Sequence, residues 1–480
     1  MGASKRNFRM WLLWGIGTLV LAGVVFAAVA SIASGRVDPL SLKLRALILP
    51  GETTHGHHQI ELACDSCHTN GFAGRDEVQA SCEGCHAGGL KAGQDSHPRK
   101  KFTDPANFDR LQAIDATYCV SCHVEHKPDI AHAGGVTVPK DFCVLCHADI
   151  ADTRPSHAGM AFQTCTNSGC HSYHDNLSLK ENFLLDHAEG GFLKDEPKVR
   201  ERRLLQVLEE SESYPWDDYP IQPLAAEDAD HDASLADPHA EAAWLASKHA
   251  EAGVNCSACH QVGSKRESEW VAKPDHKPCA TCHALEVDTF QAGLHGMRLT
   301  TGLGPMTPAG ARLPMKGDVA HFELGCTSCH GAHDFDTRRA AAEACMSCHN
   351  DEHTLAYRDS PHHALWQAEL AGTAPAGSGV SCASCHMPRI EHIGDDFSRR
   401  TLVQHNQNAT LFPASKMARS VCLNCHGLGF ALDALADRQL AQRNFGGRPS
   451  TAVDSIRMAV ERDRQIREQR AAQSATPPPQ

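Results

Sequence analysis

The longest apolar stretch of the chain lies near its N-terminus. Residues 11–33 (WLLWGIGTLVLAGVVFAAVASIA) contain no charge, and Lys5, Arg6 and Arg9 precede them. About 20 apolar residues suffice to cross a bilayer as a helix, and the preceding cations place residues 1–10 in the cytoplasm. The pattern predicts a transmembrane signal anchor. A cleaved signal peptide is the alternative, although its apolar core usually has only roughly 7–15 residues.

Beyond this stretch, no long amphipathic helix or alternating strand pattern separates the cysteine motifs described below. Residues 194–212 suggest a charged helix, and residues 432–473 suggest a second one at the C-terminal end. Between residues 209 and 241 there are eleven acidic residues, no Lys or Arg, and four prolines. Such a composition is typical of a solvated linker. A docking patch for a basic redox partner is the second interpretation of this segment.

The composition indicates that side chains alone do not fill the core. The chain has 480 residues, and only 6% of them are aromatic. A soluble protein of this length would usually bury more aromatic surface. The net charge of −13 argues against a nucleic-acid partner, which requires a basic surface.

All 22 cysteines occur in pairs, and each pair is followed directly by a histidine. Ten pairs have the spacing CxxCH, and the eleventh has four residues between its cysteines. The pairs with their histidines are Cys64, Cys67 and His68; Cys82, Cys85 and His86; Cys119, Cys122 and His123; Cys143, Cys146 and His147; Cys165, Cys170 and His171; Cys256, Cys259 and His260; Cys279, Cys282 and His283; Cys326, Cys329 and His330; Cys345, Cys348 and His349; Cys382, Cys385 and His386; and Cys422, Cys425 and His426.

This pattern predicts covalent attachment of c-type haem. A disulfide framework or a zinc site does not require a histidine after each pair, and a thioredoxin-like motif would occur once. In CxxCH the two thiols form thioethers with one porphyrin, and the histidine becomes the proximal iron ligand. We therefore expect eleven haem c groups. The stretched Cys165–Cys170 pair needs a looped turn, which residues 166–169 (TNSG) can supply; a failed site is the alternative there.

The histidines outside the motifs are candidate distal ligands. Of 32 histidines, 21 remain after the proximal ones. A second axial histidine saturates the iron and lowers its potential relative to a methionine ligand, so most haems should only carry electrons. The candidates are His57, His58, His97, His126, His132, His157, His174, His249, His276, His295, His321, His333, His353, His362, His363, His392 and His405.

The predicted fold class is mainly α with much irregular loop. Intervals between motifs are too short to build an apolar core, so we expect two multihaem modules whose cores are packed porphyrins, together with one N-terminal transmembrane helix. The expected segments are residues 1–10, a cytoplasmic N-terminus; 11–33, the anchor; 50–190, a five-haem module; 191–245, a charged helix and acidic linker; 246–435, a six-haem module; and 436–480, a charged helix and tail.

The exported portion resembles the multihaem c-type cytochromes. The His55-Gly-His57-His58 run and the stretched Cys165–His171 site are similar to class III low-potential cytochromes. Residues 357–363 (YRDSPHH), followed by 382–388 (CASCHMP), resemble the nitrite reductase and hydroxylamine oxidoreductase superfamily. That second resemblance implies His362 or His363 as a distal ligand of the CxxCHMP haem. The chain has no CxxCK motif and no Tyr after Tyr357, so neither active-site signature of that superfamily is present.

The sequence favours a membrane-anchored periplasmic electron carrier. We expect a quinol-linked membrane donor, a periplasmic redox protein as acceptor, and location at the inner (cytoplasmic) membrane with a single pass and the bulk of the chain in the periplasm. The alternative function is a terminal reductase or oxidase of small nitrogen or sulfur oxyanions. That enzyme would use one five-coordinate haem in the second module.

Overall fold

Helices and irregular loops make up most of the structure, as the sequence predicts. The computed structural model describes residues 11, 13–26, 51–69, 74–112, 114–139, 142–154, 157–159, 172–176, 179–194, 212, 214–218, 222–264, 267–393 and 399–475. The elements of residues 51–194 are η1 (His58–Ile60), η2 (Cys64–Ser66), α3 (Arg75–Ala92), α4 (Arg99–Thr103), η3 (Pro105–Gln112), η4 (Cys119–Ser121), η5 (Pro128–Ile130), η6 (Ala133–Gly135), α5 (Val144–His147), α6 (Ile150–Thr153) and α8 (Glu181–Asp186).

The remaining elements follow the predicted linker. They are η8 (Ala226–Asp228), η9 (Ala233–Leu235), α10 (Pro238–Leu245), α11 (Lys248–Glu251), α12 (Ser257–His260), β1 (Gln261–Ser264), β2 (Glu267–Trp270), α13 (Lys277–Ala280), α14 (Ala284–Gln291), α15 (Met297–Thr300), η10 (Pro308–Gly310), η11 (Gly317–Val319), α16 (Cys326–His330), α17 (Thr337–Ala341), α18 (Glu343–Cys348), α19 (Glu352–Tyr357), α20 (Pro361–Leu370), α21 (Cys382–His386), β3 (Arg389–Ile393), β4 (Arg399–Val403), α22 (Ala414–Ser420), η12 (Cys422–Asn424), α23 (Leu428–Ala436), α24 (Arg438–Gln442) and α25 (Ser455–Ala475).

The apolar N-terminal stretch does not form the predicted membrane-spanning helix. Residues 11 and 13–26 are helical. Among the residues that the structure describes, no helix is both long enough and apolar enough to cross a membrane. The transmembrane part of the predicted fold class is therefore wrong.

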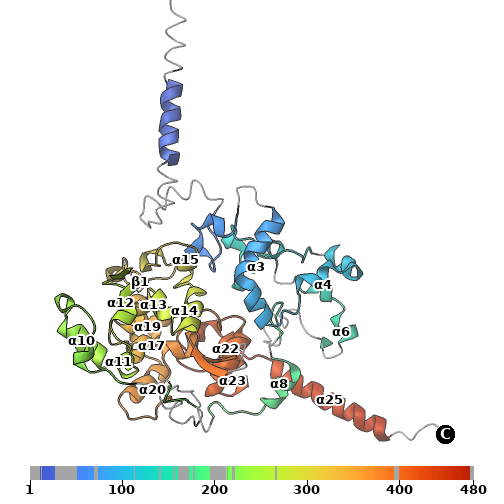
Figure 1. The fold of residues 1–480 in the computed structure, drawn as a ribbon. Helices are drawn as coiled ribbons and strands as arrows, with labels where there is room; N and C mark the ends of the chain where they lie inside the picture. Colours follow the sequence, from blue (N-terminus) through green and yellow to red (C-terminus); the bar gives the residue numbers. More distant parts are fainter. Residues whose placement is uncertain are drawn as a thin grey trace, which may run out of the picture.

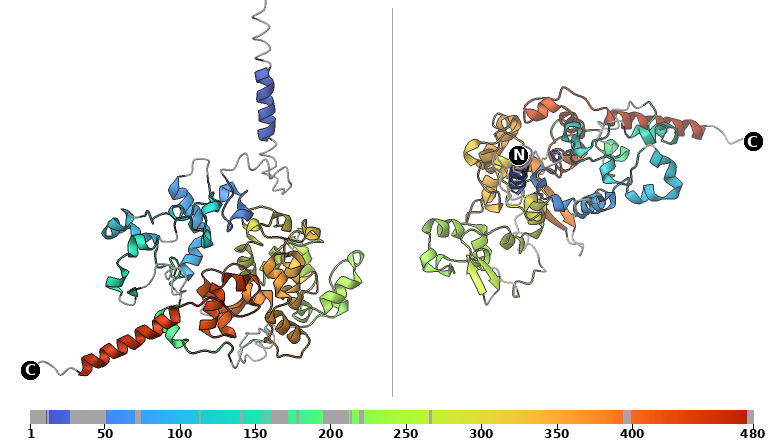
Figure 2. Two further views of the ribbon diagram at one scale, coloured as in Figure 1. Left: turned by 180° about the vertical axis from the view of Figure 1, so that it is seen from behind. Right: turned by 90° about the horizontal axis from the view of Figure 1, so that it is seen from above.

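The helices gather in two lobes with the C-terminal elements between them. Figure 1 shows α3, α4 and α6 on one side and α10 to α20 on the other, with α22 and α23 in the middle. The view from behind in Figure 2 shows the same arrangement, and in both views α25 projects away from the body. The two strand pairs, β1 with β2 and β3 with β4, are antiparallel hairpins of the second lobe.

Two small clusters of buried apolar side chains occur in the described part of the chain. The larger joins Leu179 and Leu184 of the first lobe to Leu428 and Leu432 of α23 and to Ala459 of α25. The smaller consists of Ala342, Tyr357 and Trp366. Both clusters lie toward the C-terminal half, so side-chain packing gives the first lobe little core of its own.

Polar contacts join the two lobes. The buried guanidinium of Arg298 donates to the carbonyl oxygen of Gln59 at 3.1 Å and to that of Gly304 at 2.9 Å. Arg312 donates twice to the carbonyl oxygen of Thr53, each at 3.0 Å. These cations belong to the second lobe, and they hold the first-lobe segment on both sides of His57, at Thr53 and at Gln59.

The acidic segment before the second lobe makes defined local contacts in its described residues 222–241. Its carboxylates accept hydrogen bonds from backbone amides: Asp232 caps η9 through Ser234, and Asp237 caps α10 through His239. Asp230 accepts from the backbone N–H of Ser257 at 2.9 Å, directly beside Cys256. Composition alone suggests a solvated linker because it does not distinguish capping carboxylates from free ones. The charged helix predicted over 194–212 falls almost entirely outside the described residues.

Candidate functional site

Each described cysteine pair lies on a single helical turn with its histidine. The backbone N–H of His68 donates to the carbonyl oxygen of Cys64 at 2.8 Å, and His283 and His426 make the same bond to Cys279 and Cys422, each at 2.8 Å. This i to i−4 hydrogen bond brings the first cysteine and the histidine onto one helix face, with the second cysteine beside them. A porphyrin held by both thiols would therefore lie directly over the imidazole.

Nine of the motif histidines face a second histidine from another part of the chain. The ring centres are 5.7 to 6.3 Å apart in every pair. The pairs are His86 with His57, His147 with His97, His123 with His174, His283 with His249, His260 with His333, His349 with His295, His330 with His405, His386 with His353, and His426 with His362.

This separation fits two imidazoles on opposite sides of one metal ion. An imidazole nitrogen lies about 2 Å from the metal it binds, and the ring centre lies about 1 Å further out, which gives about 6 Å between ring centres. The partners are 29 residues apart in His57–His86 and 75 residues apart in His330–His405. Each such pair thus connects distant segments, and the residues present fit an axially bis-histidine haem.

Hydrogen bonds at Nδ1 fix the tautomer of many of these rings. Nδ1 of His260 donates to the carbonyl oxygen of Val271 at 2.8 Å, that of His426 to Phe192 at 2.7 Å, and that of His353 to Ala441 at 2.6 Å. A proton held at Nδ1 leaves Nε2 free as the metal-binding atom. The β1–β2 hairpin supplies one of these acceptors, because it returns the chain to His260 and stacks Trp270 on that ring.

Burial keeps several of these imidazoles in the neutral form that binds iron. Burial lowers the pKa of His295, His330, His362 and His386 to about 4, and a facing or neighbouring imidazole adds to the effect in each case. A neutral ring is the ligand form of histidine. The site is therefore ready to ligate without first losing protons near neutral pH.

Short capping residues position several distal histidines. Ser247, Asp351 and Ser360 each accept a backbone hydrogen bond at the start of a helix, and a histidine follows two residues later in each case: His249, His353 and His362. Asp95 accepts from the backbone N–H of His97 in the same spacing. Side chains of Ser and Asp are favoured at helix starts because they satisfy free backbone N–H groups. The pattern Ser/Asp-x-His is thus a sequence signal for these ligands, although His239 follows Asp237 without facing a motif histidine in the described residues.

The chain turns sharply after α16 to present His333. Gly331 has a φ of +77°, and His333 itself has a φ of +73°. With a ψ of 161° as well, Gly331 adopts a backbone conformation that L side chains rarely take, so this turn favours glycine. The turn directs His333 away from its own motif, and its ring faces His260 instead. The second histidine of a CHxxH sequence therefore serves another motif, as also happens with His174 and His123.

Other predicted ligands do not face a motif histidine in the described residues. His126 donates to the carbonyl oxygen of Gly51, and the exposed ring of His363 donates to that of Arg358. No imidazole faces His68 at the spacing of the nine pairs, again within the described part of the chain. Candidates for which no such pairing is seen there are His58, His126, His132, His276, His321, His363 and His392. His157 takes part in an interaction outside these nine pairs. The stretched site of Cys165, Cys170 and His171 lies outside the described residues.

Thiols of successive motifs lie next to one another in chain order. The thiols of Cys82 and Cys119 lie close enough for one to shift the pKa of the other, and so do those of Cys279 and Cys326 and of Cys345 and Cys382. The second cysteines also approach the following motif, with Cys67 beside Cys85, Cys259 beside Cys279, Cys329 beside Cys345 and Cys385 beside Cys422. No disulfide joins two of the described cysteines. The six motifs of the second lobe therefore form one continuous series.

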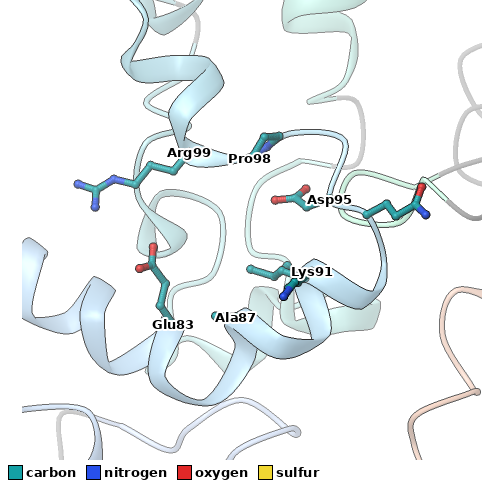
Figure 3. Close-up of a pocket in the computed structure, with 8 residues that line it drawn as sticks. Glu83, Ala87, Lys91, Asp95, Pro98 and Arg99 are labelled. Atoms are coloured by element: carbon teal, nitrogen blue, oxygen red, sulfur yellow. The ribbon is translucent and has the colours of Figure 1, made fainter. Parts of the chain in front are cut away.

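A shallow hollow adjoins the motif of α3. It encloses about 530 Å³ and is lined by Glu83, Lys91, Asp95 and Arg99 among other residues. Figure 3 shows the carboxylate of Asp95 and the amino group of Lys91 at this hollow. Its lining contains both charges and no cysteine or histidine. In the described residues, no three or more His, Cys, Asp or Glu side chains converge as a metal-binding group.

Comparison with known proteins identifies part of the first lobe. Residues 56–148 match the family model of cytochrome c3. The matched segment contains four of the cysteine motifs, from Cys64 to His147. No curated protein and no solved structure matches the chain. The match supports a multihaem electron-transfer cytochrome with covalently bound haem c, and it leaves the second lobe and its superfamily resemblance unassigned.

Proposed function

We propose that this protein relays electrons along eleven covalently bound haems, from a quinol-linked donor of the cytoplasmic membrane to a redox-protein acceptor. The observation that carries the proposal is the set of nine facing histidine pairs. When bound, the haems supply one-electron chemistry, and the protein supplies their ligation and spacing. A periplasmic location is part of the proposal, because c-type haem is attached outside the cytoplasmic membrane in bacteria.

The residues of the chain do three things toward this function. When haem is bound, the cysteine turns would hold each porphyrin through their two thiols, and the facing histidines would supply the ligands of its iron. The adjoining thiols of successive motifs, such as Cys345 and Cys382, keep neighbouring porphyrin edges together. Electrons can then pass between neighbours without leaving the protein. The route would follow the order of the motifs in each lobe.

The oxyanion reductase or oxidase is less well supported. It would need an open iron position in the second lobe, where His260, His283, His330, His349, His386 and His426 each face another histidine. An iron with two strong axial ligands cannot bind substrate unless it loses one. In the described residues, the only motif histidine not seen facing another is His68, in the first lobe.

Mass spectrometry and electron paramagnetic resonance (EPR) of the natively matured protein test the proposal together. The expected result is the mass of eleven added haems, spectra dominated by low-spin iron, and no turnover of nitrite, hydroxylamine or sulfur oxyanions. A mass without added porphyrin would contradict the haem assignment. Turnover of one of these anions, accompanied by a high-spin signal from the second lobe, would contradict the carrier assignment and favour the enzyme.

A further inference from the structure

Two distal histidines of the first lobe contact a carboxylate through Nδ1, whereas other distal histidines contact a backbone carbonyl oxygen through that atom. Nδ1 of His57 lies 2.7 Å from a carboxylate oxygen of Glu125. Nδ1 of His174 donates to the carboxylate of Asp95 at 3.2 Å. By contrast, Nδ1 of His97 donates to the carbonyl oxygen of Tyr173, and that of His405 to the carbonyl oxygen of Val403.

The two carboxylates are held in place by other groups. Glu125 also accepts from the backbone N–H of Thr54 at 3.2 Å and from the hydroxyl of the same residue. Asp95 also accepts from the backbone N–H of His97 at 3.0 Å, and only 14% of its side chain is exposed. Each carboxylate is thus positioned by the fold and does not merely follow the histidine.

The histidines concerned serve two adjacent motifs. His57 faces His86, and His174 faces His123. The two motifs are neighbours, because the thiol of Cys119 lies close enough to that of Cys82 to shift its pKa. In the second lobe, the nearest comparable carboxylate is that of Asp351, which stands 3.6 Å from Nδ1 of His349 and accepts from Thr354. The two short contacts between a carboxylate and Nδ1 therefore belong to two neighbouring motifs, those of His86 and His123.

From this arrangement, we infer that Glu125 and Asp95 lower the reduction potentials of the haems at Cys82–His86 and Cys119–His123. Asp95 accepts the Nδ1 proton of His174, which makes that imidazole a stronger donor to iron. The 2.7 Å contact between Glu125 and Nδ1 of His57 lacks hydrogen-bond geometry, so Glu125 acts there through its charge. The negative charge of each carboxylate in a partly desolvated site favours the oxidised iron over the reduced iron. The two haems form the most reducing part of the first lobe, so an electron placed there passes on to neighbouring sites. This inference rests on the proposed function insofar as both motifs must carry haem.

The test is spectroelectrochemical titration of Glu125→Gln and Asp95→Asn in the full-length holoprotein. Both replacements keep a hydrogen-bond acceptor and remove the charge. Each should raise the reduced-to-oxidised ratio of one haem about tenfold at a fixed applied potential, which is about 59 mV for a one-electron couple. The matched control is Asp129→Asn, which removes an exposed charge of the same lobe. The control should leave every potential unchanged.

Three results would overturn the inference. Unchanged potentials in both variants would mean that the carboxylates only hold the rings. A new high-spin EPR signal would mean that the distal ligand had been lost rather than tuned. An equal shift in Asp129→Asn would show a general effect of net charge. The intact mass is measured first. A chain without haem at these two motifs would contradict the proposed function as well as this inference, whereas the three results above, obtained with haem present, contradict the inference alone.

Discussion

The ring of His362 faces His426, with ring centres 6.2 Å apart, and it does not pair with the nearer motif at His386. His386 instead faces His353. Ser360 caps α20, which places His362 in the first turn of the helix and leaves the ring of His363 exposed. The sequence resemblance left both histidines open as ligands of the CxxCHMP haem, and the structure assigns neither of them to that site.

The first prediction separates these two adjacent histidines. His362→Ala should convert one haem per chain to a high-spin form, because the iron above His426 loses its second ligand. His363→Ala is the matched control and should leave all haems low-spin, since Nδ1 of that ring donates to the carbonyl oxygen of Arg358 and its Nε2 is hydrogen-bonded to Gln367. EPR of the oxidised proteins measures both. A high-spin signal in His363→Ala, or none in His362→Ala, would contradict the assignment.

The sequence predicted the attachment motifs because they are local, whereas ligand pairing is not. Two thiols and a histidine on one turn can be recognised from spacing alone, as at Cys326–His330. The partner of that histidine, His405, comes from 75 residues further on and depends on the β3–β4 hairpin and on the hydrogen bond between His405 and Thr289. The sequence therefore shows which histidines lie outside the motifs, but it does not show which motif histidine each of them faces.

The N-terminal helix was predicted wrongly for a related reason. Hydropathy records how apolar residues 11–33 are, whereas the described part of this stretch contains no helix long and apolar enough to cross a membrane. The sequence also carries a local signal for distal ligands, namely a helix-capping Ser or Asp placed two residues before the histidine. Ser247, Asp351 and Ser360 each stand two residues before a paired histidine. Because a cap is a local interaction with a defined geometry, it could have ranked these ligands above candidates such as His276 and His321.

The second prediction concerns the contact between the lobes. Arg298→Met removes a buried cation that donates to the carbonyl oxygens of Gln59 and Gly304. Loss of hydrogen bonds to a charged group should lower the free energy of unfolding by about 1.5–3 kcal/mol. Thermal or denaturant unfolding followed by circular dichroism measures this change. Arg338→Met makes the same replacement at an exposed position of α17 and should change stability by less than about 0.5 kcal/mol. Equal losses in the two variants would contradict a specific role for Arg298.

The third prediction concerns the chain without its cofactor. Cofactor binding and folding are linked when a preformed core is absent. Protein expressed without haem attachment should therefore lose amide protection around the motifs of the first lobe. Residual protection should be confined to the cluster that joins Leu184, Leu428 and Ala459. Hydrogen exchange with mass spectrometry measures this directly. Holo-like protection of α3 in the apoprotein would show that side chains alone stabilise the first lobe.

The last prediction concerns acid stability at α24. The carboxylate of Asp437 accepts from the backbone N–H and the hydroxyl of Ser450, each at 2.7 Å, and from the N–H of Leu440 at 3.0 Å. Hydrogen bonds from Ser450 and then from Leu440 lower the pKa of Asp437 to about 2. A carboxyl whose pKa is lower in the folded state stabilises the fold above its unfolded pKa of about 3.9. That contribution is lost as the pH falls through about 2.

Asp437→Asn should therefore unfold at a lower temperature than the wild type at neutral pH, and the difference should shrink between pH 4 and pH 2. The same helix accepts the Nδ1 proton of His353 at Ala441, so the low-spin spectrum of its haem provides a second readout. Thermal unfolding across this pH range is the measurement. Asp318→Asn, at an exposed carboxylate, is the control and should match the wild type throughout. A difference in unfolding temperature between wild type and Asp437→Asn that stays constant from pH 7 to pH 2 would contradict this prediction. Protonation of Asp437 would then leave the stability unchanged, so its negative charge would not be what stabilises the fold.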